Sequence, residues 1–206
     1  SNALERLGAG YVGRRAPDMC FWQDEWFRGM DLITGPDGGV FIADWSDTGE
    51  CHDHDGVHRT SGRIYKLTYG RPDPIIALDL TNQSESQLLA FQSHANTWWA
   101  RTARRILTER YSASTAQSDV STLRKQIEST MHRSADTATK IRLLETCYGV
   151  GAAEPSWLVS FLSHEDEQLR VAALRLLVDQ QTPDACTLSP QSQSALVAMA
   201  NHDSSG

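Results

Sequence analysis

The amino-acid sequence predicts an α+β fold, in which a small antiparallel β-sheet is followed by an array of paired α-helices. Short runs of β-forming residues between Gly and Pro turn signals fill the first third of the chain. Apolar residues at helical spacing fill the rest. The sequence Arg-Pro-Asp-Pro at residues 71–74 separates the two parts, because proline removes a backbone donor and favours extended structure in the residue before it.

These patterns divide the chain into a β part, residues 4–74, and a helical part, residues 75–206. Residues 1–3, Ser-Asn-Ala, are typical of a remnant left when a purification tag is removed, and we exclude them from the expected fold. With 206 residues, the chain is long enough for one large domain or two small ones.

In the β part, the sequence predicts four or five short strands. Composition favours strands around residues 11–12, at 18–22 and at 30–34. The strand at 40–45 is expected most strongly, because the turn signal Pro-Asp-Gly-Gly runs directly into it. Residues 63–69 alternate apolar and polar side chains, as a half-buried strand does, and are expected to pair with that strand. One four-stranded sheet of this kind is the unit that β-propellers repeat.

In the helical part, apolar spacing predicts seven helices. Asn96 and Asp136 are expected to cap two of them, and Pro155 suits the first turn of another. The predicted helices cover residues 80–92, 94–110, 120–131, 138–150, 155–163, 164–180 and 191–201.

An internal repeat supports this pattern. Residues 164–180 can be laid over residues 94–110, which places His164 on His94 at equivalent turns before a helix. The offset equals two repeats of roughly 35 residues, which suits stacked helix pairs. A shared structural role for the two histidines is therefore favoured over a metal site.

Two stretches of the β part carry a family resemblance. Residues 26–45, WFRGMDLITGPDGGVFIADW, together with residues 62–70, GRIYKLTYG, resemble the last blade of the β-propeller in membrane-bound bacterial dehydrogenases related to the soluble glucose and sorbosone quinoprotein dehydrogenases. The helical part, between residues 80 and 201, resembles the HEAT-type repeats into which such proteins often continue. The resemblance implies that residues 4–74 are a terminal blade and that residues 75–206 are a HEAT-like solenoid.

The resemblance also implies a function for the whole parent protein. The parent would oxidise a sugar or an alcohol with pyrroloquinoline quinone and calcium, pass electrons to a haem c domain downstream, and lie in the periplasm or the cell envelope. This chain would then be a non-catalytic segment, with no cofactor of its own, that links the remaining propeller blades to the downstream domain. The alternative is a HEAT-type scaffold that binds a protein partner and has no dehydrogenase chemistry.

Three charged residues of the β part are candidates for cofactor binding. The resemblance places Arg28, Asp31 and Asp44 near the central channel, where quinone and substrate bind in the quinoprotein relatives. The alternative is a buried ion pair between Arg28 and Asp31 or between Arg28 and Asp44, because buried charges must be paired.

A His-rich loop at residues 51–58 is a candidate metal site. Imidazole and carboxylate groups are ligand types for zinc and other transition metals, and carboxylates also bind calcium. The spacing fits no standard zinc pattern and lacks the terminal Glu of an EF-hand loop, so an internally hydrogen-bonded loop is the favoured alternative. The candidate ligands are His52, Asp53, His54, Asp55 and His58.

The cysteines leave two interpretations open. The chain has four cysteines and no CxxC or CxxCH motif, which argues against paired-cysteine zinc and covalent haem in this segment. Cys20 and Cys51 form a disulfide if the compartment is oxidising, or remain free thiols.

Charge and hydropathy exclude two classes of partner. The formal net charge of −7 argues against binding to nucleic acid or to an anionic membrane, because both require a cationic surface. No apolar run approaches the ~20 residues that cross a bilayer. Near Trp98 and Trp99 lie Arg101, Arg104 and Arg105, which we interpret as a solvated or salt-bridged face beside a core Trp99.

Overall fold

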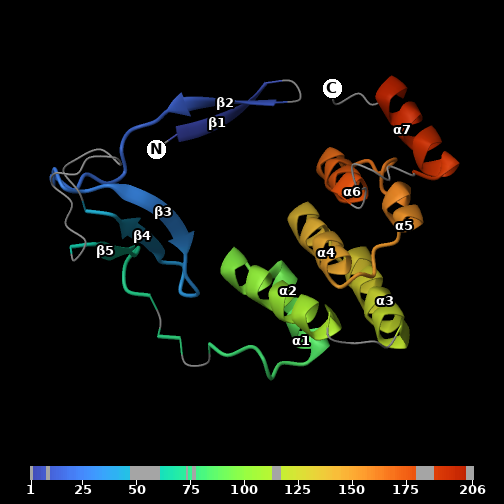
Figure 1. The fold of residues 1–206 in the computed structure, drawn as a ribbon, viewed down its shortest axis with the longest axis horizontal. Helices are drawn as coiled ribbons and strands as arrows, with labels where there is room; N and C mark the ends of the chain where they lie inside the picture. Colours follow the sequence, from blue (N-terminus) through green and yellow to red (C-terminus); the bar gives the residue numbers. More distant parts are fainter. Residues whose placement is uncertain are drawn as a thin grey trace. The chain divides into compact units, whose positions relative to one another are not determined.

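The computed structural model describes residues 2–7, 10–46, 61–72, 74–75, 78–112, 117–179 and 188–202. The chain forms two compact units, Ser1–Leu78 and Asp79–Gly206, which we call the β unit and the helical unit. Every strand that the structure describes lies in the β unit, and every described helix lies in the helical unit (Figure 1). The predicted α+β class is confirmed. The division follows Leu78, slightly beyond the prolines at which the sequence placed it.

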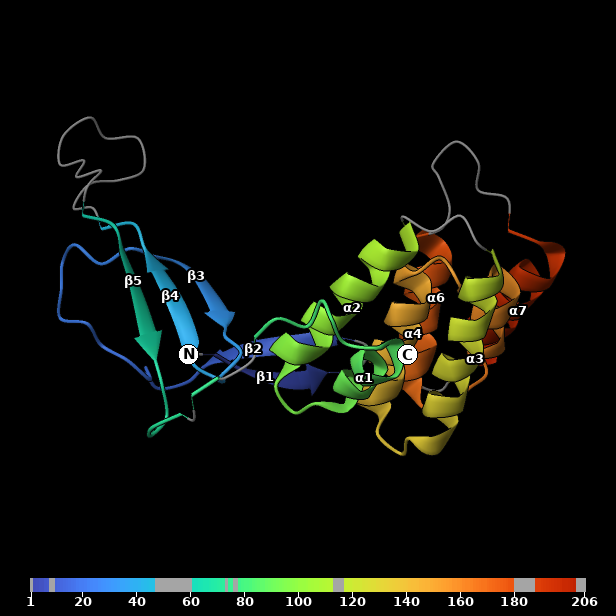
Figure 2. The same ribbon diagram turned by 90° about the horizontal axis from the view of Figure 1, so that it is seen from below.

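The strands of the β unit form two antiparallel sheets. Strands β1 (Asn2–Leu7) and β2 (Gly10–Arg15) make a two-stranded sheet. Strands β3 (Gly29–Thr34), β4 (Val40–Asp44) and β5 (Arg63–Leu67) make a three-stranded sheet in the order β3-β4-β5 (Figure 2). The sequence suggested one four-stranded sheet; in the part of the chain that the structure describes, the N-terminal strands pair with each other instead.

The first strands differ from expectation in two ways. Strand β1 begins at Asn2, so Asn2 and Ala3, which we left out of the expected fold, take part in the sheet, and Asn2 pairs with Arg15. Backbone pairing of this kind requires no apolar side chain, and every side chain of β1 is exposed. Residues 18–22, expected to form a strand, have no regular structure, because the Trp22 ring packs on the three-stranded sheet and the backbone does not extend it.

The turn between β3 and β4 forms as predicted. The N–H of Gly35 donates to the carbonyl of Gly39 (2.7 Å), and the N–H of Gly38 donates to the carbonyl of Gly35 (3.1 Å). Gly38 has a φ of 80°, a left-handed conformation that costs glycine little and other residues more. This tight turn sets the register of the β3-β4 pair.

In strand β5, the side chains that face inward are not the ones that the sequence pattern predicted. Ile64, expected on the half-buried side, is 77% exposed. Arg63 and Tyr65 are half-buried instead. Their face of the sheet is the one that interacts with Trp22 and with a buried carboxylate, so contacts outside the strand override its apolar pattern.

The helical unit has two layers. The second helices of successive pairs, α2, α4 and α6, lie side by side in chain order, while α1, α3 and α5 pack against them and α7 packs against α5 (Figures 1 and 2). The elements are α1 (Glu85–Ala90), the 3-10 turn η1 (Phe91–Ser93), α2 (Thr97–Ser112), α3 (Gln117–Arg133), α4 (Thr137–Gly149), α5 (Pro155–Ser160), α6 (Glu167–Asp179) and α7 (Pro190–His202).

The same turn precedes each of α2, α4 and α6. The Nδ1 atom of His94 accepts a hydrogen bond from the N–H two residues ahead (3.0 Å), and Nδ1 of His164 does the same (2.9 Å). In the middle turn, Ser134 Oγ accepts the corresponding bond (3.2 Å). The structural role predicted for the two histidines is therefore confirmed, and the repeat extends to a third turn that lacks histidine.

The helix caps predicted from the sequence are also confirmed. Asn96 Oδ1 accepts from the N–H two residues ahead (3.0 Å), and Asp136 Oδ2 accepts from the N–H three residues ahead (2.9 Å). Asp166 caps α6 in the same way as Asn96 caps α2 (2.9 Å). Pro155 stands in the first turn of α5. Each cap satisfies an N–H that has no partner inside its helix.

The apolar core belongs to the helical unit. Among the described residues of the β unit, Ile42 is the only buried apolar side chain. None of the described helices is long and apolar enough to cross a membrane. The fully buried side chains of the helical core include Leu88, Leu107, Leu123, Ile127, Leu143, Leu144, Cys147, Leu158 and Leu177.

Candidate functional site

The β unit contains an ionic network built around Asp44. This carboxyl group is buried at the end of β4, where it accepts hydrogen bonds from the N–H groups of Arg28 (2.7 Å) and Ser46 (3.0 Å). Arg63 stands opposite Asp44 in the register of β4 and β5 and donates from Nε to Asp44 Oδ2 (2.7 Å). The same guanidinium donates from Nη1 to Asp24 Oδ2 (2.6 Å). The network thus joins three separate stretches of the β unit.

The network keeps both carboxyl groups ionised. Burial raises the pKa of Asp44, but two backbone N–H groups and Arg63 outweigh it and hold that pKa below its usual value. The N–H of Trp26 and the guanidinium of Arg63 lower the pKa of Asp24. Hydrogen bonds to Asp24 and Asp44 raise the pKa of Arg63. Groups held in one charge state and paired with each other suit packing better than proton transfer.

The ion pair expected between Arg28 and Asp44 is replaced by one between Arg63 and Asp44. Arg28 contacts Asp44 through its backbone N–H, while its Nη1 donates to the carbonyls of Glu25 (2.8 Å) and Phe27 (3.0 Å). The reason lies in the register, because Arg63 is the direct cross-strand neighbour of Asp44.

Asp31, the third candidate for cofactor binding, does not join this network. Its side chain is exposed and accepts a hydrogen bond from the N–H of the next residue, Leu32 (2.7 Å). The structure therefore brings Asp44 and the backbone of Arg28 together and leaves the carboxylate of Asp31 at the surface.

Aromatic rings cover the network. Trp22 stacks on Phe27, with ring centroids 4.4 Å apart and planes at 10°. Trp22 also meets Tyr65 edge to face at 5.8 Å. The guanidinium of Arg63 lies over the ring of Tyr65, 5.5 Å from its centroid. These contacts attach the segment before β3 to strand β5, which gives the ion pairs a structural role.

The candidate metal ligands His52, Asp53, His54, Asp55 and His58 lie outside the described residues. Cys51, the proposed disulfide partner of Cys20, lies in the same stretch. Within the described ranges, no three His, Cys, Asp or Glu residues are close enough together to hold a metal ion.

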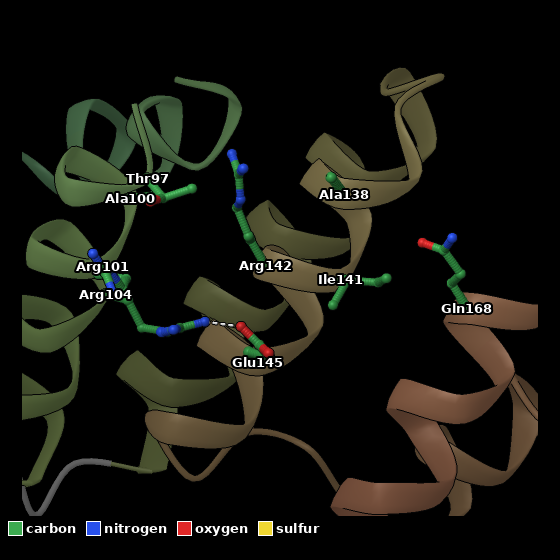
Figure 3. Close-up of a pocket in the computed structure, with 9 residues that line it drawn as sticks. All are labelled: Thr97, Ala100, Arg101, Arg104, Ala138, Ile141, Arg142, Glu145 and Gln168. Atoms are coloured by element: carbon green, nitrogen blue, oxygen red, sulfur yellow. Dashed lines mark hydrogen bonds and ion pairs between the residues drawn. The ribbon is translucent and has the colours of Figure 1, made fainter. Parts of the chain in front are cut away.

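The helical unit carries a second candidate site, a hollow of about 370 Å³ on the layer formed by α2, α4 and α6 (Figure 3). Its side chains come from all three helices, and small or apolar residues lie between charged ones. We call it the arginine groove, defined by Thr97, Ala100, Arg101, Arg104, Ala138, Ile141, Arg142, Glu145 and Gln168.

The three arginines of the groove have different surroundings. Arg104 forms an ion pair with Glu145 across α2 and α4, drawn as a dashed line in Figure 3. Arg142 donates from Nη1 to the carbonyls of Gln92 (3.0 Å) and His94 (3.1 Å), so backbone oxygens fix its position. Arg101 is exposed and makes no hydrogen bond or ion pair with any residue that the structure describes.

The salt-bridged arginine face predicted from the sequence is right for two residues. Arg104 pairs with Glu145, and Arg105 pairs with Glu109 within α2 (2.7 Å). Arg101 is not paired in this way. Trp99 is packed against the core, as predicted, and stacks on an aromatic ring of η1.

The sequence missed the arginine groove. The positions of Thr97, Arg101 and Arg104 at spacings of four and three place them on one face of α2, which is a signal that the sequence contains. Arg142 and Gln168 carry no such signal, because their closeness to Arg101 depends on how the helices pack.

Comparison of the chain with family models, with curated proteins and with solved structures gave no match.

Proposed function

We propose that this chain is a non-catalytic segment whose helical unit binds a protein partner through the arginine groove. The observation that carries the proposal is that the three alternate helices α2, α4 and α6 contribute charged and polar side chains to one shared groove outside the core. Stacked helix pairs commonly bind proteins across the surface that successive repeats share.

The two sides of helices α2, α4 and α6 have different surroundings, which supports this function. One side of each helix is buried in the core, while polar and charged residues of α2, α4 and α6 line the groove. Four charged side chains gathered in one hollow, outside the core, indicate a surface that can recognise a ligand by its charge. The core sides of the three helices consist of Ala103, Ile106 and Leu107, of Leu143, Leu144 and Cys147, and of Leu169, Ala173 and Leu177.

A peptide library displayed on phage and selected on the whole chain tests this function. We expect to recover peptides whose binding is lost when Ala138, exposed in the groove, is changed to Trp. The matched control is Lys125→Trp, which places the same bulk on an exposed position of α3 outside the groove. If the recovered peptides bind both variants as well as the unchanged chain, the proposed function is wrong.

We also propose, as a second function, that the β unit completes a larger β assembly of the quinoprotein dehydrogenase type. Apolar side chains exposed on the three-stranded sheet support it: Leu32 is 68%, Ile33 55% and Ile64 77% exposed. Leu32 lies on one face of the sheet and the two isoleucines lie on the other, as neighbouring blades on both sides would require. Pyrroloquinoline quinone, calcium, the haem c domain and the periplasmic or cell-envelope location belong to this proposal and rest on the family resemblance.

The parent protein tests the second function. We expect the full-length protein to bind pyrroloquinoline quinone in a calcium-dependent way and to reduce a dye with a sugar or alcohol as donor, and this chain alone to do neither. A full-length protein without quinone binding or oxidation would refute it and leave the protein-binding function standing.

A further inference from the structure

We propose that the partner of the arginine groove is an acidic, extended segment of another protein, whose carboxylates pair with Arg101 and Arg142. This inference rests on the proposed protein-binding function and names the chemistry of the partner.

Charge in the groove is opposite to the charge of the chain. Three arginines and one glutamate line the groove, whereas the chain as a whole carries a formal charge of −7. Arg104 and Glu145 neutralise each other. Arg101 and Arg142 make no ion pair with any carboxylate in the described ranges, although the charge of Arg142 helps to lower the pKa of Asp136 at the start of α4, so both guanidiniums can still pair with a ligand. The groove therefore favours an anionic ligand.

The arginines differ in how they can bind. Arg142 is held by two backbone carbonyls through Nη1, and a guanidinium has five N–H donors, so donors remain for a carboxylate without loss of that anchor. A pre-positioned side chain loses little conformational entropy on binding. Arg101 is exposed and adaptable. A guanidinium matches a carboxylate with two parallel hydrogen bonds, which makes a carboxylate side chain a fitting ligand for both.

The shape of the groove indicates an extended segment. Packed helices lie about 8–10 Å apart, so a chain that crosses from α2 over α4 to α6 spans roughly 16–20 Å. An extended peptide of about six residues covers that distance. Ala100, Ala138 and Ile141 lie among the polar groups of the groove and leave room for a small or apolar side chain. The expected segment thus has acidic residues on either side of a small apolar one.

A protein segment fits better than a nucleic acid. A nucleic acid carries its charge along its whole length, which the net charge of −7 on the chain disfavours. Two guanidiniums that lack a carboxylate partner, near Glu145, suit a ligand with a few carboxylates at fixed places.

Fluorescence anisotropy with labelled peptides tests the inference on the whole chain. The probes are three peptides of about eight residues with a central Ala-Leu, flanked by Glu and Asp, by Gln and Asn, or by Lys. We expect the acidic peptide to bind at least about tenfold more tightly than the neutral one, and added salt to weaken its binding. Equal affinity for the acidic and neutral peptides would overturn the inference.

Three variants of α2 locate the contact. Arg101→Gln should weaken the acidic peptide about tenfold, whereas Arg105→Gln, on the same helix but outside the groove, should change its affinity less than about twofold. Arg101→Glu should reverse the preference toward the Lys peptide. Circular dichroism checks that all three variants are folded. Equal loss from Arg101→Gln and Arg105→Gln would overturn the inference.

The outcomes separate this inference from the proposed function. If the phage selection yields groove-dependent peptides that are neutral or basic, the protein-binding function stands and the acidic partner is refuted. If no groove-dependent peptide is recovered, both fail. Tighter binding of a single-stranded oligonucleotide than of the acidic peptide, lost in Arg101→Gln, would replace the acidic partner with a nucleic acid.

Discussion

At the scale of single residues, Asp44 is the point where the segments of the β unit meet. Its carboxylate accepts two backbone N–H groups and pairs with Arg63, which in turn reaches Asp24. The unit has little buried apolar surface in its described part, so polar contacts have an unusually large share in holding it together.

Replacing Asp44 with Asn should destabilise the β unit by about 2–3 kcal/mol, because Arg63 loses a buried partner. Hydrogen exchange of the β4 and β5 amides in the whole chain measures the change. Asp31→Asn is the matched control, because the side chain of Asp31 is exposed and accepts a hydrogen bond from the N–H of the next residue, Leu32. An effect of the same size from both variants would contradict the structural role of Asp44.

The β unit should lose stability in acid. The pKa values of Asp24 and Asp44 are lowered in the folded chain, so their contribution is present above the unfolded-state pKa of about 3.9 and is lost as the pH falls through the lower folded values. Exchange of the β4 amides measured between pH 7 and pH 3 should stay level, apart from the intrinsic rate, until about pH 4 and then accelerate. In Asp44→Asn, the acceleration of exchange below pH 4 should be smaller. An acceleration as large as in the unchanged chain would contradict the stabilising role of the Asp44 carboxylate.

Two cysteines should differ in reactivity. Cys147 is fully buried in the helical core, and burial raises its pKa to about 12, whereas Cys20 is partly exposed. Since the thiolate is the reactive form, iodoacetamide at pH 8 should label Cys20 more than about 100-fold faster than Cys147. Peptide mass spectrometry compares the two rates, and unfolding in denaturant should remove the difference. Similar rates in the native chain would place Cys147 outside the core.

At the scale of the elements, local signals in the sequence locate the helices and four of the five described strands, but not how the strands pair or which of their faces lies inward. The caps Asn96 and Asp136 and the apolar spacing behind them act within a few residues, so the sequence alone locates α2 and α4. The side of β5 that faces inward depends on Trp22 and Asp44, which are distant in the chain. For the same reason residues 18–22, rich in β-formers, supply a packing ring and no strand.

Loss of the Asp136 cap should cost about 1 kcal/mol of stability in the helical unit. Asp136 Oδ2 accepts from both the N–H and the hydroxyl of Thr139, and Asp136→Ala leaves both without that partner. Thermal unfolding should show a midpoint lower by about 2–4 °C. Glu165→Ala, an exposed acidic residue of the following turn, should change the midpoint much less. A larger shift from the control would contradict the cap.

At the scale of the whole molecule, the two units are unlike in how they are stabilised. The helical unit has a continuous apolar core, and the β unit depends on an ionic network and a layer of aromatic rings. This difference is consistent with the proposal that the helical unit supplies the binding surface.

The contacts between different helices and strands in the candidate sites could not be predicted from the sequence. Arg101 and Arg104 were noticed in the sequence because they lie close together on one helix, but their partner Glu145 and the neighbouring Arg142 come from another helix. Only the packing of α2 against α4 brings them together. Asp44 was noticed for its place at a strand end, yet its partner Arg63 depends on the pairing of β4 with β5.

Nuclear magnetic resonance of the whole chain, titrated with the acidic peptide, tests the central claim most directly. The account predicts that amide shifts change mainly at the groove residues of α2 and α4, around Arg101, Arg104, Ala138 and Arg142. Shift changes confined to the β unit, or to the separate hollow around Trp157 that residues of α3, α4, α5 and α6 line, would contradict it.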